Sequence, residues 1–148
     1  MKKTILLSIM ILLGVSYTVF AQDDGSPLLI SGSVDTYYKY QFDKVQGATS
    51  FAQDINSFSI GMANIIQSKE VGRASFVADV AFGPRADNSA PGPVHILYVS
   101  YALSDKVSVT GGFMGTFVGY EVISPTGNFN YSTSYLFSTG PFQNGGLK

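Results

Sequence analysis

Apolar and polar residues alternate with a period of two along most of the chain after about residue 27. This alternation is typical of β-strands whose two faces meet different surroundings. No pattern with the period of a helix stands out beyond the first 21 residues, so we predict an all-β protein. The expected strands lie at about residues 28–43, 57–67, 73–83, 94–103, 107–118 and 130–138.

The first predicted strand shows the alternation most clearly. One face carries Ile30, Gly32, Val34, Thr36, Tyr38, Tyr40 and Phe42, and the other carries Ser31, Ser33, Asp35, Tyr37, Lys39, Gln41 and Asp43. A strand over residues 28–43 is longer than the about 5 to 6 residues of a globular strand and the about 9 to 11 that cross a bilayer. We therefore expect strands that project beyond a membrane.

Two short connections predict hairpins. Pairing Gln67 with Arg73 brings together two apolar faces: Phe58, Ile60, Met62, Asn64 and Ile66 against Phe82, Val80, Ala78, Phe76 and Ala74. Asn64 is the polar exception on this face, and the pattern does not explain it. The second hairpin is expected to pair Leu103, Tyr101, Val99 and Leu97 with Val107, Val109, Gly111 and Phe113.

Long and short connections alternate along the predicted strands. The long ones lie at residues 44–56, 84–93 and 119–129, and the short ones at residues 68–72 and 104–106. This arrangement is typical of outer-membrane barrels, which have short periplasmic turns and long external loops. We therefore predict an antiparallel up-and-down transmembrane β-barrel with an aromatic girdle that includes Tyr38, Tyr40, Phe42, Phe58 and Phe82.

In such a barrel the apolar faces contact lipid and the polar faces line the lumen. The candidate lumen-facing residues are Asp35, Tyr37, Lys39, Arg73 and Asp79. They could set the ion preference of a pore, or they could be ordinary solvated positions on a sheet face.

The beginning of the chain has the pattern of a secretory signal peptide. Lys2 and Lys3 precede an apolar run at residues 5–15, and Ala21 closes a small-residue cleavage site. The apolar run is shorter than the about 20 residues of a membrane-spanning helix, so we expect cleavage and export rather than an anchor. Residues 1–21 are the predicted signal, and residues 22–148 the barrel.

Composition excludes several other functions. Charged residues make up 13% of the chain, against about 25% for an ordinary soluble domain. Removing Lys2 and Lys3 from the 9 basic residues leaves 7 against 10 acidic ones, which disfavours nucleic-acid binding. With no Cys and a single His, His95, we expect no catalytic residues, no metal site and no cofactor. We expect His95 to be a loop or strand-edge residue.

Residues 98–113, with the sequence YVSYALSDKVSVTGGF, followed by GYE at 119–121, NFNYS at 128–132 and GPF at 140–142, also carry a family resemblance. This ordered set resembles the OmpL-like family of outer-membrane β-barrel porins, over most of the chain from about Leu28 onward. The resemblance implies a polar lumen and a pore role, and it supplies no catalytic residues. The family's porins are longer and many barrels end on an aromatic strand, so we expect residues 22–148 to be an N-terminal portion with about six strands.

These observations predict an outer-membrane channel through which small solutes diffuse passively, with outer-membrane lipid and small solutes as its partners. The alternative is a structural or adhesive outer-membrane barrel, or a secreted β-sandwich with binding loops. An enzyme is disfavoured, because His95 would be the one candidate base for acid–base catalysis.

Overall fold

One antiparallel sheet forms the body of the computed structural model, which describes residues 26–45, 47, 49 and 51–148. Its strands follow one another in chain order, from β1 to β6. They are β1 (Leu29–Tyr38), β2 (Phe58–Val71), β3 (Ala74–Phe82), β4 (Val94–Ser104), β5 (Val107–Gly115) and β6 (Gln143–Leu147). The predicted all-β fold with six antiparallel strands is confirmed. The predicted signal peptide, residues 1–21, lies outside the described residues.

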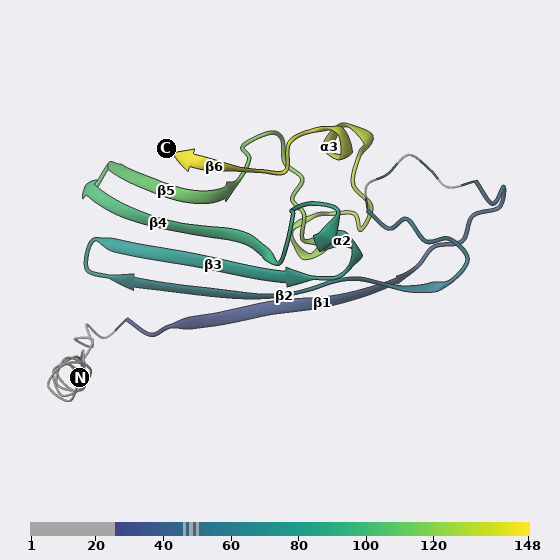
Figure 1. Ribbon diagram of the computed structural model, residues 1–148, viewed down its shortest axis with the longest axis horizontal. Coiled ribbons are helices and arrows are strands. Elements are labelled where there is room, and N and C mark those ends of the chain that lie inside the picture. Colours follow the sequence, from purple (N-terminus) through teal and green to yellow (C-terminus); the bar gives the residue numbers. More distant parts are fainter. Residues whose placement is uncertain (1–25, 46, 48, 50) are drawn as a thin grey trace, which may run out of the picture.

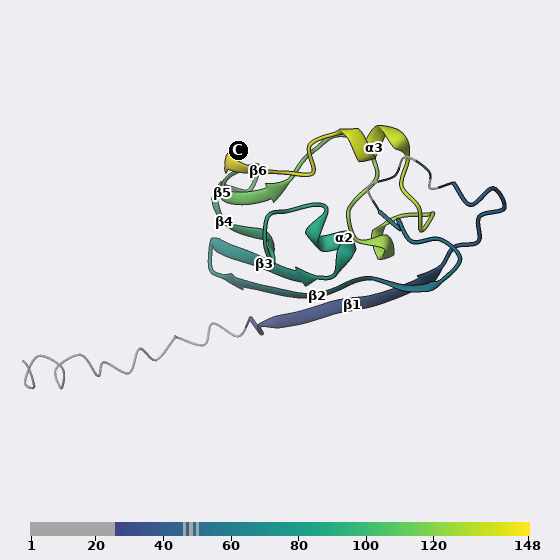
Figure 2. The ribbon, with the colours of Figure 1, turned by 45° about the vertical axis from the view of Figure 1, so that its right-hand side comes forward.

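The sheet is curved, and the long connections gather at one of its ends (Figures 1 and 2). These connections contain three short helical segments, α2 (Pro84–Asp87), η1 (Pro125–Gly127) and α3 (Tyr135–Thr139). The two tight hairpin turns, β2–β3 and β4–β5, lie at the opposite end of the sheet. The predicted alternation of short turns and long connections is therefore present. Within the described residues, no helix is long and apolar enough to cross a membrane.

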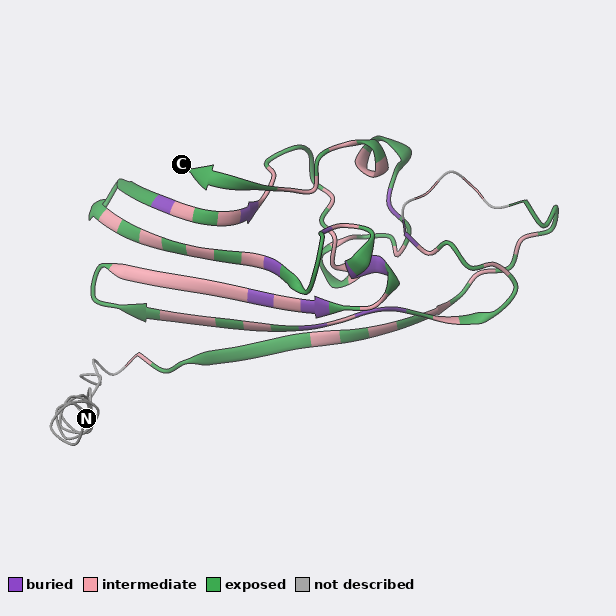
Figure 3. Cartoon of the chain, viewed as in Figure 1, coloured by how far each residue is buried: buried purple, intermediate pink, exposed green. Residues whose placement is uncertain are grey.

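The two faces of the sheet differ in burial, as the alternating colours along β4 and β5 show (Figure 3), and also in chemistry. The convex face presents exposed apolar side chains, among them Ile30, Val34, Tyr38, Phe58, Ile60, Ile65, Phe82, Leu97, Val99, Tyr101 and Val109. Phe58 is 88% exposed and contacts Tyr38, with ring centroids 5.0 Å apart. The concave face instead carries the buried polar residues Asn64, Asp79 and Thr110.

Most strands have the length that a membrane crossing needs. β1 has 10 residues, β3 and β5 have 9 each and β4 has 11, within the about 9 to 11 of a tilted transmembrane strand. The predicted first strand over residues 28–43 was too long, because β1 ends at Tyr38. Beyond it, one further backbone hydrogen bond joins the two segments, from the Asn56 N–H to the Lys39 carbonyl oxygen (2.7 Å).

The predicted register of the β2–β3 hairpin was wrong. Ala63 pairs with Phe82 and Val71 with Ala74, so the turn is the residue pair Gly72 and Arg73. Gly72 has φ +58°, a conformation that glycine adopts readily and that two-residue hairpin turns require. The prediction kept residues 68–72 as a loop, although Ser68–Val71 extend the ladder.

A β-bulge in β2 accounts for the error. The register between β1 and β2 shifts between Val34 and Thr36, and both Gly61 and Met62 are buried there. The extra residue moves every later side chain of β2 to the opposite face. Phe58 and Ile60 point outward as predicted, whereas Met62, Asn64 and Ile66 lie on the concave side.

The predicted β4–β5 hairpin is confirmed over most of its length. Leu97 pairs with Phe113, Val99 with Gly111 and Tyr101 with Val109. Near the turn the register shifts, so that Val107 pairs with Ser104 rather than with Leu103.

The predicted sixth strand at residues 130–138 was wrong. Residues Tyr135–Thr139 form α3, and the hydroxyl of Ser134 accepts a hydrogen bond from the Phe137 backbone N–H (3.1 Å) at its N-terminus. Such a cap favours a helix over the strand that the alternation predicted. β5 ends at Gly115 rather than at residue 118, and the sixth strand is Gln143–Leu147, which pairs with β5.

The buried apolar core is small. Met62, Ala81 and Ala86 form one cluster, and Ile123 packs against it. Phe51, in the connection between β1 and β2, is also buried. Its ring centroid lies 6.1 Å from that of Phe137 and 5.3 Å from that of Phe142. Many large apolar side chains are therefore exposed, on the convex face of the sheet and in the connections, instead of lying in a core.

Candidate functional site

A row of hydrogen-bonded polar side chains crosses the concave face from β1 to β3. The side-chain oxygen Oδ1 of Asn64 accepts hydrogen bonds from the Ser33 backbone N–H (3.0 Å) and the Ser33 hydroxyl (2.8 Å). The Asn64 amide nitrogen donates to Asp79 Oδ1 (3.1 Å). The bulge in β2 thus explains Asn64, because it places this residue between two polar partners rather than on the apolar face.

Asp35 joins the sheet to the long connection after β5. Its Oδ1 accepts a hydrogen bond from the Met62 backbone N–H (2.9 Å), and its Oδ2 accepts one from the Tyr131 hydroxyl (2.5 Å). Gly61 makes this contact possible, because a Cβ atom there would lie 1.8 Å from Asp35 Oδ2 and 2.6 Å from Tyr131 Oη. The bulge and the missing side chain together allow Asp35 to hold Tyr131 of this connection against the concave face.

Tyr131 is held in its neutral form by these surroundings. Burial raises its pKa above the usual value, and the hydrogen bond that it donates to Asp35 acts in the same direction. Tyr131 therefore stays a hydrogen-bond donor at neutral pH.

Arg85 is the second anchor of this connection, and it is 1% exposed. Its Nε donates to the Ile123 carbonyl oxygen (2.6 Å), and its two terminal nitrogens donate to the Tyr131 carbonyl oxygen (3.3 and 3.2 Å). The guanidinium carbon also lies 4.9 Å from the ring centre of Phe51 and 5.1 Å from that of Tyr131. One buried cation on α2 thus draws three separate connections together.

Four of the five predicted lumen residues bind β2 or the connection between β1 and β2. Asp35, Tyr37 and Asp79 lie on the concave side of the strands, and Asn64 links Asp79 to β1. The Tyr37 hydroxyl accepts from the Asp54 backbone N–H (3.1 Å), and the Lys39 amine donates to the Ala52 carbonyl oxygen (2.5 Å). Both side chains therefore fix the connection between β1 and β2.

Arg73 lies apart from the other predicted residues. It is exposed in the β2–β3 turn, where its guanidinium donates to the Leu103 carbonyl oxygen of the neighbouring hairpin (2.6 Å). This position is at the opposite end of the sheet from Asp35 and Tyr131.

Sequence reasoning missed Asn64, Arg85, Tyr131 and His95 as members of the site. His95 is not in a loop or at an edge, since it lies in β4 and is 2% exposed. The register of β3 and β4 shifts beside it, between Asp79 and Val80, so a second bulge turns His95 away from the convex face. The lone Arg85 after Gly83-Pro84 was the one signal in the sequence that could have indicated a buried anchor.

A cavity of about 240 Å³ lies between this part of the sheet and the connections. Polar side chains line it from β2, β3 and β4 (Asn64, Asp79 and His95), from the connection after β5 (Glu121) and from the start of β6 (Gln143). The remaining wall is mostly apolar. Met62, Ile66, Ile96, Val122, Ile123, Phe137 and Phe142 belong to it.

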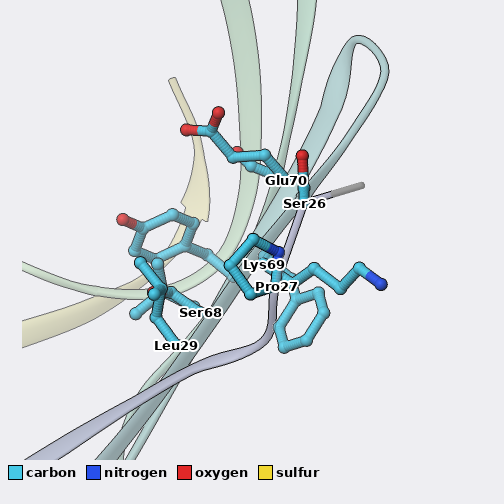
Figure 4. Close-up of a pocket in the computed structure, with 10 residues that line it drawn as sticks. Ser26, Pro27, Leu29, Ser68, Lys69 and Glu70 are labelled. Atoms are coloured by element: carbon cyan, nitrogen blue, oxygen red, sulfur yellow. The ribbon is translucent and has the colours of Figure 1, made fainter. Parts of the chain in front are cut away.

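A second hollow of about 410 Å³ lies at the turn end (Figure 4). Ser26, Pro27 and Leu29 line one side of it, and Ser68, Lys69 and Glu70 of β2 line another. Neighbouring Lys69 and Glu70 extend in different directions, as expected for successive residues of a strand. In neither hollow, nor elsewhere among the described residues, does a group of three His, Cys, Asp or Glu side chains form a metal site.

A sheet with an apolar convex face, a polar concave face and connections of alternating length has the architecture of outer-membrane barrels. A comparison with protein families matches residues 27–148 to the family described as putative beta-barrel porin-2, OmpL-like. The chain belongs to this family, and the predicted resemblance is confirmed. Neither the curated proteins nor the solved structures gave a match.

Proposed function

We propose that the protein is a passive channel of the bacterial outer membrane, through which small solutes diffuse down their gradients. The observation that carries the proposal is the separation of faces in one curved sheet. Exposed apolar side chains such as Val99 and Ile65 lie on the convex side, where lipid would contact them. The hydrogen-bonded row of Ser33, Asn64 and Asp79 lies on the concave side, where a water-filled path would run.

The proposal includes further strands that close the barrel. In the described part of the chain β1 pairs with β2 alone and β6 with β5 alone. Each unpaired backbone group in hydrocarbon costs several kcal/mol, so an open sheet of this kind is unfavourable in a membrane. We propose that strands beyond these six, from the same polypeptide or another copy, complete the wall. Export through a signal peptide cleaved after Ala21 is part of the same proposal.

The connections anchored by Arg85 and Asp35 would narrow the path at the loop end. This inward packing also favours the second candidate, a structural or adhesive barrel whose interior is filled. Neither function requires a catalytic residue or a cofactor.

Conductance in planar lipid bilayers separates the two candidates. The purified protein, assembled with whatever strands close it, should produce discrete conductance steps if it is a channel. Arg85→Leu provides a second measurement. This variant releases the connections, so the conductance steps of a narrowed channel should become larger. Folded, membrane-inserted protein that gives no steps in either form would overturn the channel and favour a filled barrel.

A further inference from the structure

The cavity of about 240 Å³ on the concave face contains polar atoms that are buried and unpartnered. Among the described residues, His95 Nε2, Gln143 Oε1 and Gln143 Nε2 have no hydrogen-bond partner. Buried polar groups are almost always hydrogen-bonded, and each exception requires an explanation such as an absent ligand or water. Three such atoms on two residues that line one cavity indicate that something polar occupies it.

The hydrogen bonds around His95 define what its free nitrogen can do. The Ser89 hydroxyl donates its one hydrogen to the Ala86 carbonyl oxygen (2.8 Å). The His95 Nδ1 atom, 3.4 Å from the same hydroxyl oxygen, must therefore be the donor in that contact. In a neutral imidazole the other nitrogen is then an acceptor, so His95 Nε2 offers a lone pair to the occupant.

The free groups are mixed in kind. His95 Nε2 and Gln143 Oε1 accept hydrogen bonds, whereas Gln143 Nε2 donates them. The Asp79 carboxylate, which accepts the Asn64 amide at Oδ1, also lines the cavity. Hydroxyl groups match such a set, because each one both donates and accepts.

Charge and the apolar wall limit the occupant further. None of the described residues that line the cavity is Lys or Arg, while Asp79 and Glu121 are acidic, so an anion is disfavoured. Phe137 and Phe142 line the wall with ring centroids 5.3 Å apart. Aromatic rings of this kind provide apolar surfaces against which the C–H face of a sugar ring can pack.

We propose that this cavity is a binding subsite for an uncharged, polyhydroxylated solute of monosaccharide size. Its volume lies just below the about 300 to 1,000 Å³ of pockets for drug-sized ligands, which suits a single sugar ring. The inference rests on the proposed channel function and adds a solute class to it. The subsite lies beside the connections that narrow the path, where a passing solute would meet it.

The test is a ligand-observed NMR titration of the folded, membrane-inserted protein with three probes of similar ring size. D-glucose should show saturable binding, D-glucuronate should bind at least several-fold more weakly because of its charge, and tetrahydropyran should not saturate because it has no hydroxyl groups. These comparisons use the native protein, so they stand even if a variant fails to fold. Equal binding of glucuronate or tetrahydropyran, or no saturable glucose binding, would overturn the subsite.

Two variants locate the binding. Gln143→Leu and His95→Phe each remove hydrogen bonds to the sugar and should weaken glucose binding about 2- to 10-fold. Gln67→Leu is the matched control, because Gln67 is exposed on β2 and pairs with Ala78 outside the cavity. Folded Gln143→Leu and His95→Phe proteins that both bind glucose as the native protein does would overturn the assignment.

Conductance measured on the same preparation distinguishes the two proposals. Conductance without saturable glucose binding refutes the subsite and leaves the channel intact. Saturable glucose binding without conductance supports the subsite and refutes the channel.

Discussion

Replacing Gly61 by Ala should destabilise the protein by a clash with the Asp35 carboxylate and the Tyr131 hydroxyl. The added Cβ would lie 1.8 Å from Asp35 Oδ2 and 2.6 Å from Tyr131 Oη, well inside contact distance. The Asp35 carboxylate must then move, and it accepts two hydrogen bonds in its present position, from Met62 and Tyr131. Hydrogen bonds to charged groups contribute about 1.5 to 3 kcal/mol each. With partial relaxation, we expect a loss of about 2 to 4 kcal/mol.

The assay is a urea titration of the membrane-inserted protein. Gly115→Ala is the matched control, since nothing lies within 4 Å of a Cβ atom at that strand position. It should change the free energy of unfolding by less than about 1 kcal/mol. In an Asp35→Ala background the clash with the carboxylate is absent and only the contact with the Tyr131 hydroxyl remains, so Gly61→Ala should cost clearly less there than in the native protein. An equal cost of Gly61→Ala with and without Asp35 would refute the reasoning.

Three further predictions follow from the faces, the topology and the buried phenol. Val99→Arg on the convex face should cost about 2 to 4 kcal/mol of stability in a membrane, and Ser100→Arg on the concave face should cost less. Equal losses of stability in a urea titration would contradict the assignment of faces. An epitope tag within residues 51–56 should be accessible to antibody on intact cells, and a tag between Asp105 and Lys106 should not. Antibody binding to the second tag and not to the first would contradict the predicted topology. The Tyr131 phenol, whose pKa is raised mainly by burial, should ionise above the ordinary tyrosine pKa of about 10. The contribution of Tyr131 to the free energy of unfolding should therefore be complete below a pH of about 10 and decline as the pH rises further. Difference absorbance spectra of the native protein against Tyr131→Phe will check this late ionisation.

The sequence predicted the sheet well where the alternation of side chains is uninterrupted. In β4 and β5, Leu97, Val99 and Tyr101 have the partners that the pattern indicated, because outward residues must match across a hairpin. β2 differs, since the bulge at Gly61 and Met62 inserts one residue and reverses every later position. This bulge is stabilised by Asp35, which is distant in the sequence and accepts a hydrogen bond from the Met62 backbone N–H. The local sequence pattern of β2 therefore does not predict it.

The candidate site was less predictable for the same reason. Its contacts join residues far apart in the sequence, such as Asp35 with Tyr131 and Arg85 with Ile123. The segment around α3 alternates like a strand, but Ser134 caps a helix there and Phe137 packs against Phe51. β6 contains Gly145 and Gly146, which have little strand preference, and it exists through its pairing with β5.

The central claim is that the convex face contacts lipid and the concave face contacts water. The chain has no cysteine, so single cysteines can be introduced along β4 and labelled with nitroxide spin labels without background. In lipid bilayers, labels at Leu97, Val99 and Tyr101 should be accessible to oxygen, and labels at Tyr98, Ser100 and Ala102 to a water-soluble nickel complex. Accessibility without a period of two, or with the two sets reversed, would contradict the claim.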